Sequence, residues 1–591
     1  RDFLLLMCEA VIGVLCACVL LVPTVLAVIQ NPRVNSPPDG WNALLYDWNQ
    51  RYVHILECFF FPPDIPARPN FTPKSEAKWA SLGAWLPLFS MTGVIGFLRM
   101  RKKHWLKTLL GILFLMAFVP VLNSAFQLFN SSYYARWFYM LTLMMSLATI
   151  IALQRACIDW KSSMKWTMGI TLGIALPIGL MVKSTQQDGN KTYTFGLEDY
   201  PTRFWSYVAI AMVSLLLLTI IFKYYKRDKK GFIRRCMGGV AAISFVYALF
   251  FVALGKTQSE DAHKEMIPYS LNGGADIDLP DTKNCRIDVY DGMDNQAMFW
   301  QIPTIQAFHS IVPGSIMDFY PSIGVQRDVG SRPETKYYGL RGLTSCRWLF
   351  DPALSGKDFA VGEADVNAPA MPGWRYYASQ NGFKIYENQY YIPMGFSYDS
   401  YITRSEYEQV DKESRHLLLL KTLVVENDDV KKVSGMLKHD DDFMSSDFSQ
   451  EAYFEDCLNR KAESCSFFEH DNGGFTAKIN ADKERLVFFS VPWEGGWSAQ
   501  VNGKDAQILK VNVGFMAVKV PAGQSTIRFN YTTPGLKQGA LISLGGAALL
   551  AFYWIVTRRY DKRHPHKRKT YRIKHALPEK PNEPAGPAEN L

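Results

Sequence analysis

The sequence lacks the short motifs that identify the common classes of soluble enzyme. It contains no P-loop, no dinucleotide fingerprint, no lipase-type nucleophile elbow and no HExxH helix. Its ten cysteines form no CxxC pair and no Cys/His spacing typical of zinc. We therefore expect no metal site of that type, and no cofactor follows from the motifs.

A signal peptide is also absent. The chain begins at Arg1 and enters an apolar helix almost at once, without a charged n-region, a short h-region and a cleavage site. We interpret the chain as one whose natural start lies upstream, so that N-terminal helices are missing.

Long apolar runs are what the sequence has in abundance. The mean hydropathy of -0.05 averages apolar blocks with a polar segment at 256–537. Each run is long enough to cross about 30 Å of hydrocarbon. We predict eight transmembrane helices, at residues 3–29, 79–98, 104–122, 134–153, 166–183, 204–222, 232–254 and 538–557.

The distribution of charge predicts how these helices are oriented. The net charge is +9, but residues 257–537 carry about -11 and the remainder about +20. The basic residues lie in short loops at 99–107, 155–165 and 223–235 and after Arg558, which is typical of the cytoplasmic side of a membrane protein and not of a nucleic-acid partner. The segments 30–78, 123–133, 184–203 and 256–537 are then expected outside the cytoplasm.

The segment 256–537 has the signals of a β-rich domain. Trp497–Val501 and Lys504–Leu509 flank Asn502-Gly503, which predicts a hairpin with a type I′ turn. Phe515–Val520 and Thr526–Tyr531 predict a second hairpin, with Ile527, Phe529 and Tyr531 on one face. The predicted parts are a transmembrane domain at 1–255 with outer loop 30–78, an extracytoplasmic α/β domain at 256–485, an antiparallel β module at 486–537, a final transmembrane helix at 538–557 and a basic cytoplasmic tail at 558–591.

Five cysteines fall in the outer segments, where disulfides can persist. Cys457 and Cys465 close a short loop and are the better candidates for a bridge. An odd number of outer cysteines leaves at least one thiol unpaired within the chain.

The outer loop 123–133 and the helix after it carry the most suggestive polar residues. Arg136 falls at the outer end of a helix, against the positive-inside bias, with Asn130, Tyr133 and Tyr134 just before it. A guanidinium there can bind a phosphate through two hydrogen bonds while the tyrosines face a headgroup or a sugar. The alternative is an interfacial aromatic belt with a snorkelling arginine.

The outer loop 30–78 offers carboxylates that could act as bases, although outer loops are usually only solvated. Tryptophans outside the membrane could stack on sugars, or could be buried in the β core or at the interface. The carboxylates are Asp39, Asp47, Glu57 and Asp64, and the tryptophans are Trp41, Trp48, Trp493 and Trp497.

Several longer stretches resemble the bacterial YfhO-type membrane proteins. They are PVLNSAFQLFNSSYYARWFYM (Pro120–Met140), WLPLFSM (Trp85–Met91), GLTSCRWLFDP with GFKIYENQYYIPMGF (Gly342–Pro352, Gly382–Phe396) and PWEGGWSAQVNGKDAQILKVNVGFMAVKVPAG (Pro492–Gly523). That family is similar to GT-C glycosyltransferases, multi-helix membrane enzymes that take a sugar from a polyprenyl-phosphate carrier on the outer face of the membrane. YfhO-type proteins are associated with glycosylating lipoteichoic acid or related wall polymers.

The resemblance implies a GT-C-like protein of the bacterial plasma membrane, with its large domain extracytoplasmic and its C-terminus cytoplasmic. Its expected partners are membrane lipid, a polyprenyl-phosphate-linked sugar and a cell-wall polymer. Arg136, with Tyr133, Tyr134 and Asn130, is then expected at the outer cavity that holds the carrier phosphate, and a divalent cation can lie near that phosphate. GT-C enzymes keep their catalytic acid in the first outer loop, which we expect to be absent here, so no catalytic base is assigned.

Two other functions compete with the transferase. A non-enzymatic, membrane-anchored envelope scaffold or glycan-binding protein would use the outer domain alone. A transporter is disfavoured, because no helix carries the intramembrane charges or the repeat that transport sites need.

Overall fold

The computed structural model describes residues 2–31, 37–65, 80–127, 129–130, 133–155, 158–187, 190–198, 200–225, 228–260, 277–292, 295–352, 359–360 and 369–563. The chain divides into two compact units, Arg1–Ala27 with Thr532–Leu591, and Val28–Tyr531. Each unit has its own packing.

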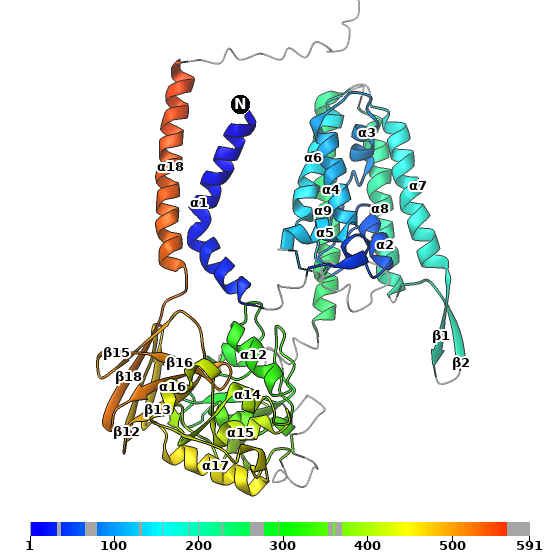
Figure 1. The fold of residues 1–591 in the computed structure, drawn as a ribbon. Helices are drawn as coiled ribbons and strands as arrows, with labels where there is room; N and C mark the ends of the chain where they lie inside the picture. The colour runs from blue at the N-terminus through cyan, green and yellow to red at the C-terminus, as the bar shows by residue number, and fades with distance from the viewer. Residues whose placement is uncertain are drawn as a thin grey trace, which may run out of the picture. The chain divides into compact units, whose positions relative to one another are not determined.

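The first unit is a pair of long apolar helices, α1 (Asp2–Ile29) and α18 (Leu536–Arg563) (Figure 1). Glycines on α18 allow the two backbones to approach closely. A Cβ at Gly539 would lie 2.4 Å from the carbonyl oxygen of Cys18, and a Cβ at Gly546 would lie 2.8 Å from the nitrogen of Cys16. Close approach at small residues is how helices associate in membranes, where lipid removes the hydrophobic drive between them.

Ser543 of α18 enters the backbone ladder of α1. The Val19 N–H donates to Ser543 Oγ at 2.8 Å, and that hydroxyl donates to the Leu15 carbonyl at 3.3 Å. In a regular helix Val19 would donate to Leu15 directly. Pro23 lies one turn further on, where its ring disturbs the carbonyl of Val19, and α1 bends (Figure 1). Ser543 therefore contacts both the Val19 N–H and the Leu15 carbonyl in the turn of α1 that precedes the bend.

The second unit begins with a bundle of mostly apolar helices. Counting both units, the described residues contain four helices that are long and apolar enough to span a membrane: Leu4–Ile29, Pro201–Phe222, Lys230–Thr257 and Leu536–Tyr560. These match four of the eight predicted spans. The bundle helices are α2 (Gln50–Glu57), α3 (Thr92–Arg99), α4 (Trp105–Phe118), α5 (Pro120–Ser124), α6 (Phe138–Leu153), α7 (Trp160–Leu180), α8 (Pro201–Phe222) and α9 (Lys229–Gln258).

The other four predicted spans differ from uniform transmembrane helices. The α4 helix and the helical stretch Pro120–Gln127 meet at a bend of 101°, so the predicted helix at 104–122 is broken before Pro120. The α6 helix has only 16 residues, and α7 has 21 but is less apolar than the four clear spans. The chain is thus a membrane-embedded helical protein with a β-rich part. Four of the spans predicted from the sequence are present as long apolar helices.

The predicted helix at 79–98 is wrong from residue 80 to Met91. Only α3 is helical, and Leu88 and Ser90, within the turn that starts at Pro87, have backbone φ angles of 69° and 46°. Leu82, Leu88 and Ser90 are fully buried. Irregular backbone within a membrane is tolerated where protein surrounds it. The apolar composition of this segment therefore indicated burial correctly, although its backbone is not helical.

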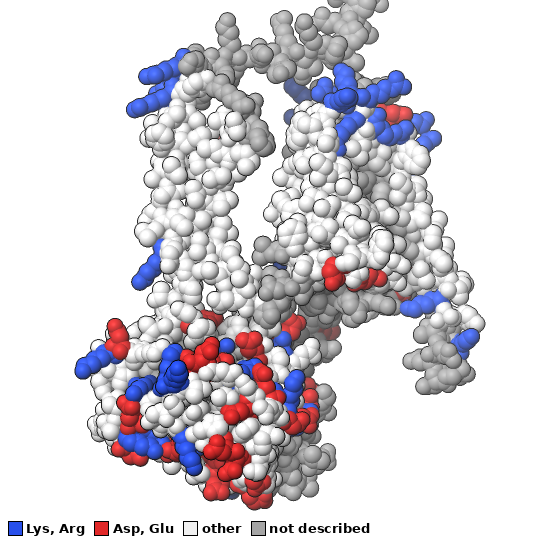
Figure 2. Space-filling model, in the orientation of Figure 1, with Lys and Arg blue, Asp and Glu red and all other residues white. Residues whose placement is uncertain are grey.

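Basic side chains gather at one end of the bundle, where α3 ends and α4, α7 and α9 begin (Figure 2). Arg99 ends α3, Lys107 lies in the first turn of α4, and Arg235 lies near the start of α9. The short basic loops of the sequence therefore meet in space. A two-stranded hairpin of β1 (Val182–Gln187) and β2 (Asn190–Phe195) joins α7 to α8.

Three sheets build the β-rich part of the second unit. The four-stranded sheet has the order β3 (Arg286–Val289), β4 (Cys346–Pro352), β6 (Phe383–Asn388), β5 (Trp374–Gln380). The five-stranded sheet has the order β11 (Phe467–Asp471), β12 (Gly474–Ala481), β18 (Gly523–Tyr531), β14 (Trp497–Val501), β15 (Lys504–Ala506). The seven-stranded sheet has the order β10 (Lys438–His439), β8 (Ser400–Thr403), β9 (Leu423–Val425), β16 (Ile508–Val511), β17 (Phe515–Val520), β13 (Arg485–Pro492), β7 (Phe396–Ser397).

The seven-stranded sheet takes strands from both sides of residue 486, so the predicted domain boundary at 485/486 lies inside a sheet. Helices pack against these sheets, and the largest buried cluster includes Phe319, Leu340, Leu418 and Phe488. The helices of this part are α11 (Gln296–Phe299), α12 (Gly314–Ser322), α13 (Gly339–Leu343), α14 (Arg404–Tyr407), α15 (Arg415–Lys421), α16 (Val430–Val433) and α17 (Gln450–Ala462).

One of the two predicted hairpins is present. Val501 pairs with Lys504 across Asn502-Gly503, whose φ angles of 51° and 77° are those of the predicted turn. The second predicted hairpin is wrong, because β17 pairs with β13 and β16 whereas β18 pairs with β12 and β14. The two consecutive strands pass into different sheets, although Ile527 and Phe529 do share the buried face of β18.

The predicted disulfide between Cys457 and Cys465 is not formed, since both are free, buried thiols. Cys457 packs in the cluster that contains Tyr453, and Cys465 packs in a different cluster that contains Phe489. Burial raises the pKa of both thiols to about 12, so they stay protonated and unreactive at neutral pH.

Gly539 and Gly545 give a matched pair of substitutions on α18. Gly539→Val should separate α1 from α18 because the new Cβ meets the Cys18 carbonyl, whereas Gly545→Val adds its Cβ where no atom lies within 4 Å. The readout is maleimide crosslinking between Glu9→Cys and Tyr553→Cys, whose native side chains are joined by a 2.6 Å hydrogen bond. Equal crosslinking in both glycine variants would contradict this packing.

His416 on α15 makes the stability of the β-rich part depend on pH. It is only 3% exposed, and its Nδ1 accepts a hydrogen bond from the Gly339 N–H at 3.1 Å. Burial, with a smaller contribution from the charge of Arg341, lowers its pKa from 6.5 to about 4. The folded chain therefore holds a neutral imidazole at a pH where the unfolded chain would already be protonated.

Stability should consequently fall as the pH drops from about 6.5 to about 4, by up to about 3 kcal/mol from this residue. His416→Asn keeps an acceptor for the Gly339 N–H but does not titrate, so its stability should fall less over that range. Urea unfolding of the fragment 256–537, which we predict to fold alone, measures this at about pH 4.5, 5.5 and 7. Parallel pH profiles for the two proteins would refute the role of His416.

Candidate functional site

The segment between α1 and α3 carries three polar side chains that are buried in the bundle. Arg51, His54 and Glu57 on α2 are 6%, 0% and 2% exposed, while Val53 and Leu56 on the other side of the helix are 42% and 46% exposed. Residues three apart lie on one helix face. This helix therefore turns its polar face inward and its apolar face outward, the reverse of a helix on a water-soluble surface.

The backbone around α2 is fixed by the two irregular segments of the bundle. The Ala84 N–H donates to the Cys58 carbonyl at 3.3 Å, and the Ala135 N–H donates to the Ala80 carbonyl at 2.8 Å. The non-helical stretch before α3 therefore lies between the end of α2 and the start of α6. This stretch is buried, and the polar groups of its irregular backbone lie near the end of α2.

Arg51 is a buried cation that faces aromatic rings. Its Cζ lies 4.1 Å from the ring centroid of Tyr133 and 5.0 Å from that of Trp48. Burial lowers the pKa of Arg51, and its buried Nη1 makes no hydrogen bond to any described residue. No carboxylate in the described ranges forms an ion pair with it. Because a buried charge is costly unless it is paired, this guanidinium is suited to bind an anion.

The neighbours of Arg51 are arranged to stay neutral. Burial first, and the charge of Arg51 second, lower the pKa of His54 to about 3, so the imidazole is uncharged at neutral pH. The buried hydroxyl of Tyr133 has no hydrogen-bond partner among the described residues, and burial raises its pKa. Tyr46 lies edge-on to Tyr133 with centroids 5.2 Å apart and donates to the Ala117 carbonyl at 2.9 Å.

The residues predicted around Arg136 fall into two groups. Arg136 is exposed, with its Cζ 4.9 Å from the ring centroid of Tyr134, whose carbonyl accepts a hydrogen bond from Gln127 Nε2 at 2.7 Å. Tyr133 turns the other way and contacts Arg51. Asn130 is half-buried, and its N–H donates to the Gln127 carbonyl. The structure thus brings Arg136 and Tyr134 together and adds Arg51, which the sequence did not single out.

Asp64, one of the carboxylates considered as a base, is already used by a buried ion pair. It binds Arg203 of α8, and Tyr207 Oη donates to its Oδ1 at 2.7 Å. Asp39 and Asp47 are exposed. Glu57 is therefore the carboxylate of this loop that lies buried on the same helix face as Arg51. The described residues contain no group of three His, Cys, Asp or Glu side chains that could hold a metal ion.

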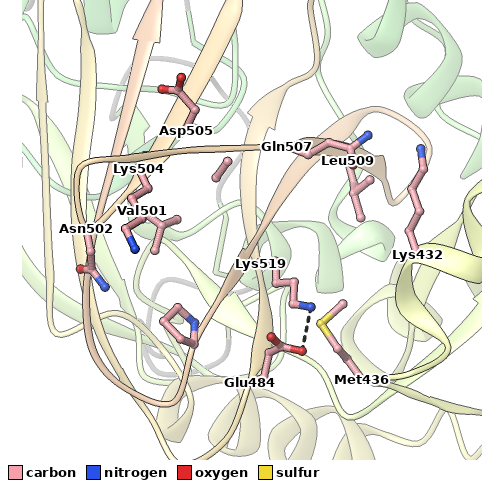
Figure 3. Close-up of a pocket in the computed structure, with 12 residues that line it drawn as sticks. Lys432, Met436, Glu484, Val501, Asn502, Lys504, Asp505, Gln507, Leu509 and Lys519 are labelled. Carbon is pink, nitrogen blue, oxygen red and sulfur yellow. Dashed lines mark ion pairs between the residues drawn. The ribbon is translucent and has the colours of Figure 1, made fainter.

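A polar cavity of about 430 Å³ lies elsewhere in this unit, beside the β14–β15 hairpin (Figure 3). Its lining includes Lys432, Lys504 and Lys519. Lys519 pairs with Glu484 at 2.8 Å, the contact dashed in Figure 3, and Lys432 pairs with Asp429 at 2.6 Å. Two of the three ammonium groups are thus already neutralised, which makes this cavity a weaker anion site than the surroundings of Arg51.

A comparison with protein-family models shows the family to which this chain belongs. The family model described as "Bacterial membrane protein YfhO" matches residues 1–465 and 448–543. The chain belongs to the YfhO family. A curated relative, the uncharacterized protein YfhO of Bacillus subtilis (strain 168), is 28% identical over 96 residues, which is 16% of this chain and 11% of that relative. No solved structure matches the chain.

This YfhO-family chain is therefore a membrane protein of bacterial type, as the sequence resemblance indicated. The site residues that sequence reasoning missed are Arg51 and His54, together with the burial of Glu57. A signal for them was present, because polar residues at 51, 54 and 57 alternate with apolar ones at 53 and 56 at helical spacing.

Proposed function

We propose that this YfhO-family protein is a GT-C-like glycosyltransferase that moves a sugar from a polyprenyl-phosphate carrier to a cell-envelope polymer of the lipoteichoic-acid type. The observation that carries the proposal is Arg51, a buried guanidinium that lies between aromatic rings and has no carboxylate partner in the described ranges. A lipid-linked phosphate supplies the missing negative charge from within the membrane.

In this mechanism Arg51 binds the carrier phosphate through its planar fork, and the faces of Tyr133 and Trp48 hold the guanidinium in place. Arg136 and Tyr134 form a second, exposed contact for a phosphate or a headgroup. The neutral His54 adds no positive charge that would compete for the anion. Glu57, buried on the same helix face as Arg51, is the carboxylate that we propose activates the acceptor hydroxyl.

The second candidate is a non-enzymatic glycan-binding scaffold, and the size and separate core of the β-rich part favour it. A scaffold needs no buried cation in the bundle. Loss of transfer on changing Arg51, with the β-rich part still folded, therefore separates the two functions.

Arg51→Gln should lower sugar transfer by roughly tenfold to a hundredfold, since a charge-assisted pair contributes about 1.5–3 kcal/mol. Arg51→Lys should restore only part of it, because an ammonium keeps the charge without the fork. Arg136→Gln is the matched variant of the exposed arginine and should have the smaller effect. The measurement is mass analysis of wall polymers, normalised to protein in the membrane. Full transfer in Arg51→Gln would remove the phosphate role of Arg51. Wall polymers that carry the same sugar with and without the wild-type protein would contradict the transferase.

The proposed transfer also requires the β-rich part to lie outside the cytoplasm. Gly330→Cys should react with a membrane-impermeant maleimide in intact cells, whereas Arg101→Cys should react only after permeabilisation. The native Cys285, Cys346 and Cys465 are buried and should give little background. The opposite labelling pattern would reverse the proposed orientation.

A further inference from the structure

A cleft of about 480 Å³ lies in the β-rich part where the four-stranded and five-stranded sheets meet. One side comes from the chain at the start of β3 and the loop before Pro303, and the other from β11, β12 and β14. Ligand sites occur preferentially at such junctions, where two packed layers leave a concave surface.

Arg286 links the β3 side of this cleft to β13, a strand of the seven-stranded sheet whose Val491 also lines the cleft. Its Nη1 donates to the Thr344 carbonyl at 2.7 Å and to Ser490 Oγ at 2.9 Å, and its Nη2 donates to the Ser490 carbonyl at 2.9 Å. Thr344 precedes β4 of the four-stranded sheet, while Ser490 lies on β13. The β3 side of the cleft is therefore fixed against β13 before a ligand binds, which lowers the cost of ordering that side.

Aromatic side chains form one wall. The ring centroid of Phe475 lies 5.3 Å from that of Phe468 and 5.7 Å from that of Trp497. Trp497 is half-buried, and its indole N–H makes no hydrogen bond to a described residue. The wall thus presents a continuous apolar surface that retains one free donor.

Polar side chains surround this wall and are not used by the fold. The side chains of Lys283, Asn284, Gln301 and His470 line the cleft, and none of them makes a hydrogen bond or an ion pair within the part of the chain that the structure describes. Two amides, an ammonium and an imidazole beside an aromatic wall match a ligand that has both an apolar face and many hydroxyl groups. A sugar ring has this chemistry.

We propose that this cleft binds an oligosaccharide segment, with a ring stacked on Trp497 and its hydroxyl groups bonded to Asn284 and Gln301. Lys283 and His470 favour a sugar that carries an acidic substituent. The inference rests on the proposed function only in identifying the glycan as part of the envelope polymer. Binding itself requires no transfer.

A strand-forming peptide is the other class of occupant, since β11 is the edge strand of its sheet. The cleft favours the glycan, because its free groups are side-chain amides and an aromatic face, whereas a peptide would gain most of its affinity from the backbone of the edge strand. The peptide therefore becomes an outcome of the test.

The test is equilibrium binding of three probes to the immobilised, detergent-solubilised chain: chitotetraose, tetragalacturonate and an alternating threonine-valine hexapeptide. We expect saturable binding of at least one glycan below about 10 mM. Trp497→Ala should weaken it at least about tenfold, and Asn284→Ala and Gln301→Ala about threefold or more. Lys283→Ala should weaken only the acidic glycan.

Trp493→Ala is the matched control. Trp493 is also partly exposed, but Lys510 Nζ lies 6.0 Å from its ring centroid and it does not line the cleft. The side chains of Asn284 and Gln301 are half-buried and exposed, so their alanine variants keep the test valid if Trp497→Ala fails to fold. Binding of neither glycan, equal weakening by Trp493→Ala, or binding of the hexapeptide alone would overturn the inference. If glycan binding fails while wall-polymer transfer persists, only this inference falls and the proposed function stands.

Discussion

The buried ion pair between Asp64 and Arg203 is the interaction on which the candidate site depends. It joins the loop that carries α2 to α8, a clear membrane span, and Tyr207 adds a hydrogen bond to the same carboxylate. Tyr247 of α9 also donates to the Pro63 carbonyl at 2.8 Å. Removing one partner of such a pair leaves a buried charge at a cost of about 3–5 kcal/mol. The loop is therefore held against the bundle by polar contacts, while apolar packing alone would not fix its register.

Once the loop is held in place, the inverted polarity of α2 has a physical reason. Val53 and Leu56 face outward, where a bilayer would accept them, and Arg51 is placed among aromatic rings. A guanidinium that stayed hydrated would need no such aromatic surroundings. The cation is kept where its desolvation is most costly, which is the arrangement expected when an anionic ligand, and not another side chain, completes the site.

The sequence predicted well those features that depend on local chemistry. The long apolar helices α1, α8, α9 and α18 and the Asn502-Gly503 turn follow from composition and from the backbone preferences of two residues. It failed where distant contacts decide. Apolar composition at 79–98 could not show that the buried backbone from residue 80 to Met91 is irregular. The sequences of the adjacent strands β17 and β18 could not show that each pairs in a different sheet. Arg51 was missed because a polar loop residue is normally assumed to be solvated.

The hydroxyl bridge of Ser543 sets an order for biosynthesis. Val19 and Ser543 are 524 residues apart, so α1 leaves the ribosome long before the helix that completes its backbone hydrogen bonds. Until α18 is made, α1 lacks the hydroxyl that contacts both the Val19 N–H and the Leu15 carbonyl. A chain that stops before Ser543 would therefore hold α1 without its partner helix.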